Sequence, residues 1–201
     1  EGPPNAWLEI SPANLVKLYI TKAEMGQGVY TSLAQLAAEE LEIPWENLSV
    51  KSASTLRGID DPFGTGGSST VSSSFTPLRE AAATLREMLR ERAATIWNIE
   101  KTYVVAMDGS VFQQQNPETK LTYGDVVAQA TGEWQIPKEK PALKPMSEFK
   151  VIGEAMPRVD FKSKLTGQAI YGYDARMEGM LYGAVARPPT SPHPACAPST
   201  T

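Results

Sequence analysis

The sequence predicts an α+β fold with a mixed sheet and two main helices. Three observations lead to this prediction: alternating apolar residues at 6–20, a helical apolar spacing at 33–41, and a longer helical spacing at 78–96. Strands and helices then follow in the order ββαβ, a loop, and αββα, which is typical of α+β domains. Strict β-α-β alternation is absent, so a doubly wound dinucleotide-binding fold is the weaker alternative.

The first strands are short and lie at the beginning of the chain. Residues 6–20 predict two strands around a turn at 12–14, where proline, alanine and asparagine follow one another. A further strand is predicted at 47–54 by alternation.

The first helix is predicted from an apolar repeat at three- and four-residue spacing, formed by Leu33, Leu36, Ala37 and Leu41. Ser32 and Gln35 match a capping box, so the helix is expected to begin near Ser32. Pro44 closes it. Glu39 and Glu40 are expected on a solvated face opposite the apolar one.

The second helix follows a glycine- and serine-rich stretch at 57–75. Its apolar stripe consists of Leu78, Ala82, Leu85, Leu89, Ala93 and Ile96. Thr76 and Pro77 suit an N-cap and a first helical position. A start near Val71 is the alternative, and the sequence leaves both open.

Two shorter signals follow. Residues 102–115 predict a hairpin with Asp108-Gly109 as its two-residue turn. Thr122 and Asp125 resemble the cap of a short helix that continues through Ala130.

The domain organisation is predicted from composition. A first α+β unit at 1–135 precedes a linker at 136–150 that is rich in proline and lysine. A second structured segment at 151–189 contains strand-like runs, "QAIYGYD" and "MLYGAVA". The last stretch, 190–201, has the composition of a disordered tail.

Composition excludes several classes of function. The 201 residues carry a net charge of −4, which argues against a nucleic-acid or anionic-membrane surface. No apolar run approaches the roughly 20 residues of a membrane-spanning helix. One cysteine excludes an internal disulfide framework. The chain starts at Glu1, so we expect a processed product or an engineered piece, without any targeting signal.

Two glycine loops are the best candidates for a ligand site. "GQGVYTS" at 26–32 and "GTGGSST" at 64–70 lie before predicted helices, where backbone N–H groups lack helical partners and glycines let a ligand approach. Neither loop fits a Walker phosphate loop or the dinucleotide fingerprint. The alternative is that both loops are only tight turns.

Other side chains make weaker sites. His193 and Cys196 offer only two metal ligands in a proline-rich tail, so we predict no metal site. The single histidine also excludes a Ser-His-Asp triad elsewhere in the chain. Asp60 and Asp61 are interpreted as a solvated turn.

Four ordered blocks resemble the large, or beta, subunit of isoquinoline 1-oxidoreductase type, within the xanthine dehydrogenase and aldehyde oxidase superfamily of molybdenum hydroxylases. The resemblance covers nearly everything from Pro4 to Pro189. The blocks are "EMGQGVYTSLAQLAAEELEIPWENLSV", "GTGGSSTVSSSFTPLREAAATLREML", "LTYGDVVAQA" and "FKVIGEAMPRVDFKSKLTGQAIYGYDARMEGMLYGAVARPP".

This resemblance implies a molybdopterin-binding-domain-like unit at 1–135 and the truncated start of an α/β hammerhead-like domain at 151–189. It also implies which residues approach the cofactor: Gly26, Gln27, Gly28, Thr31, Gly66, Gly67, Ser68 and Ser69. The neutral amide of Gln27 could hydrogen-bond the cofactor without adding a charge beside an anionic group. No position matches the family's catalytic glutamate, so we predict no catalytic residue.

The chemistry implied by the resemblance is hydroxylation of an N-heteroaromatic ring, or oxidation of an aldehyde, with water as the oxygen source. The implied cofactor is molybdopterin with molybdenum, in the cytosine dinucleotide form, and the implied partner is a small subunit with [2Fe–2S] clusters. The periplasm is the implied location, with the cytoplasm as the alternative.

The resemblance predicts an N-terminal fragment of such a subunit. The fragment is expected to be inactive alone, to bind no cofactor alone and to form a homodimer. Two other functions stay open: a non-catalytic binding or assembly module, and a structural remnant whose glycines only make turns.

Overall fold

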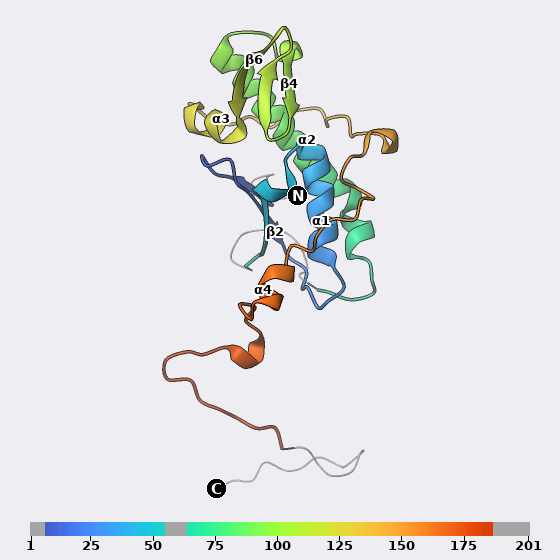
Figure 1. Ribbon diagram of the computed structural model, residues 1–201, viewed down its shortest axis with the longest axis vertical. Coiled ribbons are helices and arrows are strands. Elements are labelled where there is room, and N and C mark those ends of the chain that lie inside the picture. Colours follow the sequence, from blue (N-terminus) through green and yellow to red (C-terminus); the bar gives the residue numbers. More distant parts are fainter. Residues whose placement is uncertain (1–6, 55–63, 187–201) are drawn as a thin grey trace. The chain divides into compact units, whose positions relative to one another are not determined.

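The structure is a computed structural model that describes residues 7–54 and 64–186 (Figure 1). The chain forms two compact units, Glu1–Lys162 and Ser163–Thr201. The strands are β1 (Leu8–Ile10), β2 (Val16–Ile20), β3 (Leu48–Ser52), β4 (Val104–Met107), β5 (Ser110–Gln113) and β6 (Asn116–Thr122). The α-helices are α1 (Val29–Leu41), α2 (Thr70–Trp97), α3 (Tyr123–Gln129) and α4 (Phe161–Leu165).

The first sheet is mixed, as the sequence predicts. Strand β2 pairs antiparallel with β1 and parallel with β3, and α1 connects the two parallel strands. Alternate residues of β2 enter the core, where Val16, Leu18 and Ile20 are buried. The prediction of two strands around a turn at 12–14, followed by a strand within 47–54, is confirmed.

Helix α1 is buried on most of its surface, and it begins earlier than predicted. Its N-cap is Gly28, at φ 82°, and no Ser32–Gln35 capping box forms. The hydroxyl of Ser32 donates to the carbonyl of Gly28, and the amide of Gln35 donates to the carbonyl of Val151. The prediction failed because a carboxylate from the preceding loop, described below, binds the first free N–H groups instead.

The interpretation of Glu39 and Glu40 as solvated residues is wrong. Their relative exposures are 1% and 0%. Glu40 accepts hydrogen bonds from Arg79 at 2.7 and 2.9 Å, whereas Glu39 accepts three from consecutive backbone N–H groups at 150–152. The face opposite the leucines is therefore covered by α2 and by residues 144–152.

Glu39 makes the folded state sensitive to acid. Burial would by itself raise the pKa of its carboxyl, but hydrogen bonds from the Val151 N–H, the Lys144 ammonium and the neighbouring N–H groups hold the pKa below its usual 4.5. The stabilising contribution of a carboxyl with a lowered pKa is present above the unfolded-state pKa and is lost as pH falls through the folded-state pKa.

We therefore expect the free energy of unfolding to fall as the pH is lowered below the usual carboxyl pKa of 4.5. Glu39→Gln should cost about 1–3 kcal/mol at neutral pH, because it leaves N–H donors unpaired, and should flatten the acid dependence. Urea unfolding across this pH range checks the prediction, with Glu139→Gln at an exposed position as the control. An unchanged pH dependence in Glu39→Gln would contradict it.

Helix α2 begins at Thr70, close to the Val71 alternative and well before Thr76. Pro77 consequently lies inside the helix. Figure 1 shows α1 and α2 packed side by side, and these two helices share the core. Of the predicted stripe, the buried residues are Leu78, Ala82, Leu89 and Ala93, and Leu85 and Ile96 are partly buried.

A second, antiparallel sheet follows α2. The predicted hairpin is confirmed: Met107 pairs with Ser110 across a turn at Asp108 (φ 49°) and Gly109 (φ 69°). Both central residues have positive φ, as a type I′ turn requires. Strand β6 was not predicted and adds a third strand beside β5.

Helix α3 packs against β1 and the β1–β2 turn of the first sheet. The capping box of Thr122 and Asp125 is confirmed. Its first residue, Tyr123, is fully buried and donates a hydrogen bond of 2.7 Å to the carbonyl of Leu41.

The boundary between the compact units falls after Lys162, whereas composition indicates a linker at 136–150. Residues 144–152 are hydrogen-bonded to α1 and belong to the first unit. The strands predicted at 168–174 and 180–186 do not form: the only regular element within residues 168–186 is a 3₁₀ turn at Gly172–Asp174. A strand needs a hydrogen-bonded neighbour, and this part of the described chain provides none.

Candidate functional site

The first candidate loop, residues 24–28, is organised by its own glutamate. One carboxylate oxygen of Glu24 accepts from the N–H groups of Gly26 (2.8 Å) and Gly28 (3.0 Å), and the other accepts from Tyr30 (3.1 Å). The N-terminus of α1 thus already holds an anion. A phosphate group would compete with Glu24 for the same donors.

Glu24 is ionised in this setting. Burial would raise the pKa of its carboxyl, but the N–H donors of Gly28, Tyr30 and Gly26, together with the Arg158 guanidinium, hold the pKa below its usual range. Only 7% of the Glu24 side chain is exposed. The carboxylate is therefore a fixed part of the loop.

Gln27 lies at the surface of this loop and hydrogen-bonds within it. Its carbonyl oxygen accepts from the Met25 N–H at 2.6 Å, and its amide nitrogen donates to the Ala23 carbonyl at 2.8 Å. The side chain is exposed, so its second N–H and the remaining lone pair of its oxygen face solvent. Gln27 can thus hold its loop and still present neutral polar atoms to a ligand.

The second candidate loop, residues 65–69, precedes α2 and is open. Gly67 and Ser68 adopt positive φ values of 64° and 55°, and Ser69 is the N-cap residue without a side-chain cap. Space is free around the Cβ positions of Gly66 and Gly67, as it is around Gly26 and Gly28. In contrast to α1, the N-terminus of α2 carries no carboxylate cap in the described part of the chain.

The two loops meet. The backbone N–H of Ala23 donates a hydrogen bond of 2.8 Å to the hydroxyl of Thr65. The structure therefore brings the beginning of the first loop against the beginning of the second, although they are 42 residues apart in sequence. Asp60 and Asp61 lie outside the described residues, as do His193 and Cys196.

Thr31 lies differently from the other predicted residues. Its side chain is nearly buried, and its hydroxyl accepts from the Val159 N–H at 3.2 Å. This contact ties residue 159 to α1. The hydroxyl hydrogen of Thr31 and its second lone pair are left for other partners.

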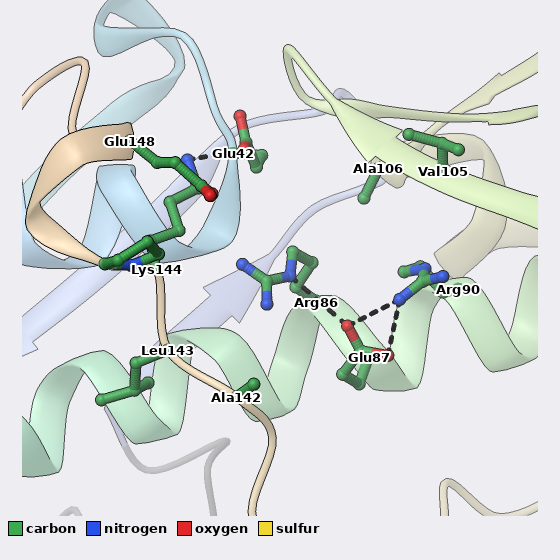
Figure 2. A pocket seen from close by; sticks show the side chains of 11 residues that line it. Glu42, Arg86, Glu87, Arg90, Val105, Ala106, Ala142, Leu143, Lys144 and Glu148 are labelled. Atoms are coloured by element: carbon green, nitrogen blue, oxygen red, sulfur yellow. Dashed lines mark hydrogen bonds and ion pairs between the residues drawn. The ribbon is translucent and has the colours of Figure 1, made fainter. Parts of the chain in front are cut away.

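A separate pocket of about 460 Å³ lies between α2, β4 and residues 142–148 (Figure 2). Arg86, Arg90 and Lys144 contribute positive charge to its lining, and Glu42, Glu87 and Glu148 contribute negative charge. The three cations form ion pairs inside the protein, for example Arg90 with Glu87 at 2.9 Å. A lining of balanced, paired charges does not indicate an anion site.

Sequence reasoning missed Glu24 and Arg158. Arg158 donates to the Gly26 carbonyl at 3.0 Å and lies 3.3 Å from a carboxylate oxygen of Glu24. The acidic residue two positions before a Gly-x-Gly was a usable signal, because carboxylates favour helix N-termini. Arg158 lies 134 residues after Glu24 in the chain, so it gave no local signal.

The described chain is thus an α+β domain in which the segment before α1 and the loop before α2 are joined by a hydrogen bond. The model of the molybdopterin cofactor-binding domain family matches residues 1–176. The chain belongs to this family.

Three relatives match about 93% of the chain. A membrane-bound aldehyde dehydrogenase (pyrroloquinoline-quinone) of Gluconacetobacter polyoxogenes is 34% identical over 196 residues, and the B subunit of nicotinate dehydrogenase of Pseudomonas putida is 31% identical over 187. The beta subunit of isoquinoline 1-oxidoreductase of Brevundimonas diminuta is 28% identical, with 94% of this chain covered. The chain spans 24%, 15% and 29% of their respective lengths.

Solved structures share the fold. A crystal structure of the Cu,Mo-CO dehydrogenase matches with a TM-score of 0.51 at 22% identity, over 59% of this chain and 15% of that chain. The reconstituted CO dehydrogenase from Oligotropha carboxidovorans matches over the same shares with a TM-score of 0.50 at 21% identity.

Proposed function

We propose that this chain supplies part of the molybdopterin site of a molybdenum hydroxylase large subunit. The observation that carries the proposal is the junction of the two open glycine loops through Ala23 and Thr65, in a chain that belongs to the molybdopterin cofactor-binding domain family. Both loops present exposed glycines with free space beside them. The residues present fit a large ligand with neutral and anionic parts.

The two loops suit different parts of such a ligand. Glu24 already occupies the N-terminus of α1, so the 24–28 loop suits neutral hydrogen-bonding groups, which Gln27 can satisfy. Among the described residues no side chain caps the N-terminus of α2, so Gly66, Gly67, Ser68 and Ser69 suit the phosphate-bearing part. Gly26 and Gly28 would allow close approach of the ligand, and the Thr31 hydroxyl could still donate one hydrogen bond and accept another.

The proposed reaction is an oxidation of an N-heteroaromatic ring or of an aldehyde. A ring C–H and water give a ring C–OH, with two protons and two electrons released. A molybdenum ion held by bound molybdopterin would accept these electrons, and we propose the cytosine dinucleotide form of the cofactor. The relatives named as nicotinate and isoquinoline enzymes support the heteroaromatic class.

A partner is part of the proposal. Two relatives carry subunit names, which supports a multi-subunit assembly. We propose a small subunit with [2Fe–2S] clusters as the electron acceptor, and the periplasm as the location, with the cytoplasm as the alternative. Among the described residues, none of the helices combines the length and the apolar character that crossing a membrane requires.

Gln27→Ala tests the cofactor site. Because the Gln27 amide is exposed, water can replace its two loop contacts, and we expect a loss of unfolding free energy of at most about 1 kcal/mol. In the full-length subunit, retention of molybdopterin should weaken about tenfold, the equivalent of one hydrogen bond. Thermal unfolding and molybdenum content per polypeptide measure the two effects.

Gln114→Ala, at an exposed position between β5 and β6, is the matched control and should change neither quantity. If Gln27→Ala lowers the melting temperature but leaves the molybdenum content per polypeptide unchanged, the loop is structural. Wild-type full-length protein that contains a quinone and no molybdenum would refute the cofactor, since one relative's name includes pyrroloquinoline-quinone. Protein without either group would favour the assembly module or the structural remnant.

We also propose that the chain alone forms a homodimer. Several large apolar side chains of the second unit are more than two-thirds exposed: Leu165, Ile170, Tyr173, Met177, Leu181, Tyr182 and Val185. Such a concentration of apolar surface favours association, most simply as a two-fold dimer. Light scattering at micromolar concentrations should show dimers, and Ile170→Ser with Leu181→Ser should give monomers. A wild-type monomer at all concentrations would count against the dimer.

A further inference from the structure

The segment 144–159 runs along α1 and is fixed to it by side chains four residues apart. Residues at this spacing lie on one face of a helix. Thr31 accepts from the N–H of Val159, Gln35 donates to the carbonyls of Val151 and Glu154, and Glu39 accepts from the N–H groups of Lys150, Val151 and Ile152. The path of the segment is therefore set by this face of α1.

Arg158 lies at the end of that path and reaches the 24–28 loop. One terminal nitrogen donates to the Gly26 carbonyl at 3.0 Å, and the other lies 3.3 Å from Glu24. The guanidinium is itself oriented by Asp160, with two contacts of 3.0 Å. Glu24 in turn binds the N–H groups at the start of α1. Arg158 thus touches both the backbone of the loop and the carboxylate that shapes it.

We infer that Arg158 is a positioning residue for the 24–28 loop. It fixes Glu24 and the Gly26 carbonyl, and through them it holds Gln27 at the surface where the second loop begins. Arginine suits this role because its planar fork serves Gly26, Glu24 and Asp160 at once, which a lysine ammonium cannot do with the same geometry. The importance of this positioning for a cofactor rests on the proposed function.

The effect of Arg158 on the 24–28 loop can be measured without any cofactor. In the 201-residue chain, amide hydrogen exchange in Arg158→Ala should accelerate about tenfold at Gly26, Gly28 and Tyr30, with the second half of α1 unchanged. Arg158→Lys should recover only part of the protection. Arg176→Ala removes the same charge from a side chain whose contacts are local, to the carbonyls of Tyr173 and Ala175, and should leave the loop unchanged.

Unchanged exchange at Gly26, Gly28 and Tyr30 in Arg158→Ala would overturn the inference. Faster exchange throughout α1 with a lower melting temperature would also overturn it, because Arg158 would then be a general stabilising residue. In the full-length subunit, Arg158→Ala should reduce molybdenum content and Arg176→Ala should not. Absence of molybdenum from the wild type would refute the proposed function and leave the exchange result standing.

Discussion

Replacing Glu40 by alanine is expected to lower the free energy of unfolding by about 3–5 kcal/mol, because the change leaves buried cations without their partner. Glu40 is fully buried, and the side chains of Arg79 and Arg86 are only 8% and 13% exposed. Arg79 is also held between the rings of Phe75 and Phe149, each 5.0 Å from its guanidinium carbon. It cannot reach water without unpacking these contacts.

Glu80→Ala is the matched control. Glu80 pairs with Lys140, whose side chain is 72% exposed, and exposed pairs contribute about 0–1 kcal/mol. The double variant Glu40→Ala/Arg79→Ala should cost less than the sum of the two single variants, because both remove the same interaction. Urea unfolding gives all four values. A loss below about 1 kcal/mol in Glu40→Ala would show that the pair is not buried in solution.

Gly124→Ala is expected to destabilise the first unit by about 3 kcal/mol, at the upper end of the range for overpacking, since the new methyl group meets rigid backbone. A Cβ at this position would lie 2.4 Å from the Pro12 carbonyl oxygen and 2.6 Å from the Asn14 nitrogen. The Gly124 N–H also donates to the Asn14 side chain at 3.1 Å. The substitution would push α3 away from the β1–β2 turn.

Gly183→Ala is the control for this change. Its Cβ would meet no atom within 4 Å, and its φ does not require glycine, so the effect should stay within about 0.5 kcal/mol. Thermal or urea unfolding compares the two variants. Equal stability of Gly124→Ala and wild type would contradict the close approach of α3 to this turn.

Local signals predicted the elements that depend on nearby residues. The Asp108-Gly109 turn and the Thr122–Asp125 capping box form within a few residues, and both are confirmed. The start of α1 was missed because Glu24, outside the expected cap, binds its N–H groups. Local sequence patterns therefore predicted turns and caps well only where the partner lies in the expected position.

The buried charges depended on distant partners. Glu40 was predicted to be solvated because it lies opposite the leucine face of its helix. In the structure, Arg79 and residues 144–152 cover it. The alanines at 34, 37 and 38 were an available signal, since a helix that is apolar around most of its circumference is buried. The contact of Arg158 with the 24–28 loop could not be predicted from spacing.

For the glycine loops, the sequence indicated both as ligand candidates, and the structure adds the contact between Ala23 and Thr65. The number and positions of the glycines alone do not distinguish a turn from a loop that binds a ligand. Placement of the two loops beside each other required the packing of α1 against α2. Their role in cofactor binding stays a prediction.

If both loops face one molybdopterin, cofactor binding should protect both from amide hydrogen exchange, which can be measured in the full-length subunit with and without cofactor. We predict slower exchange in the loaded protein at residues 24–30 and 65–72 together, with no change in β4–β6. Protection of only one loop, or of neither, in protein that contains stoichiometric molybdenum would contradict this arrangement.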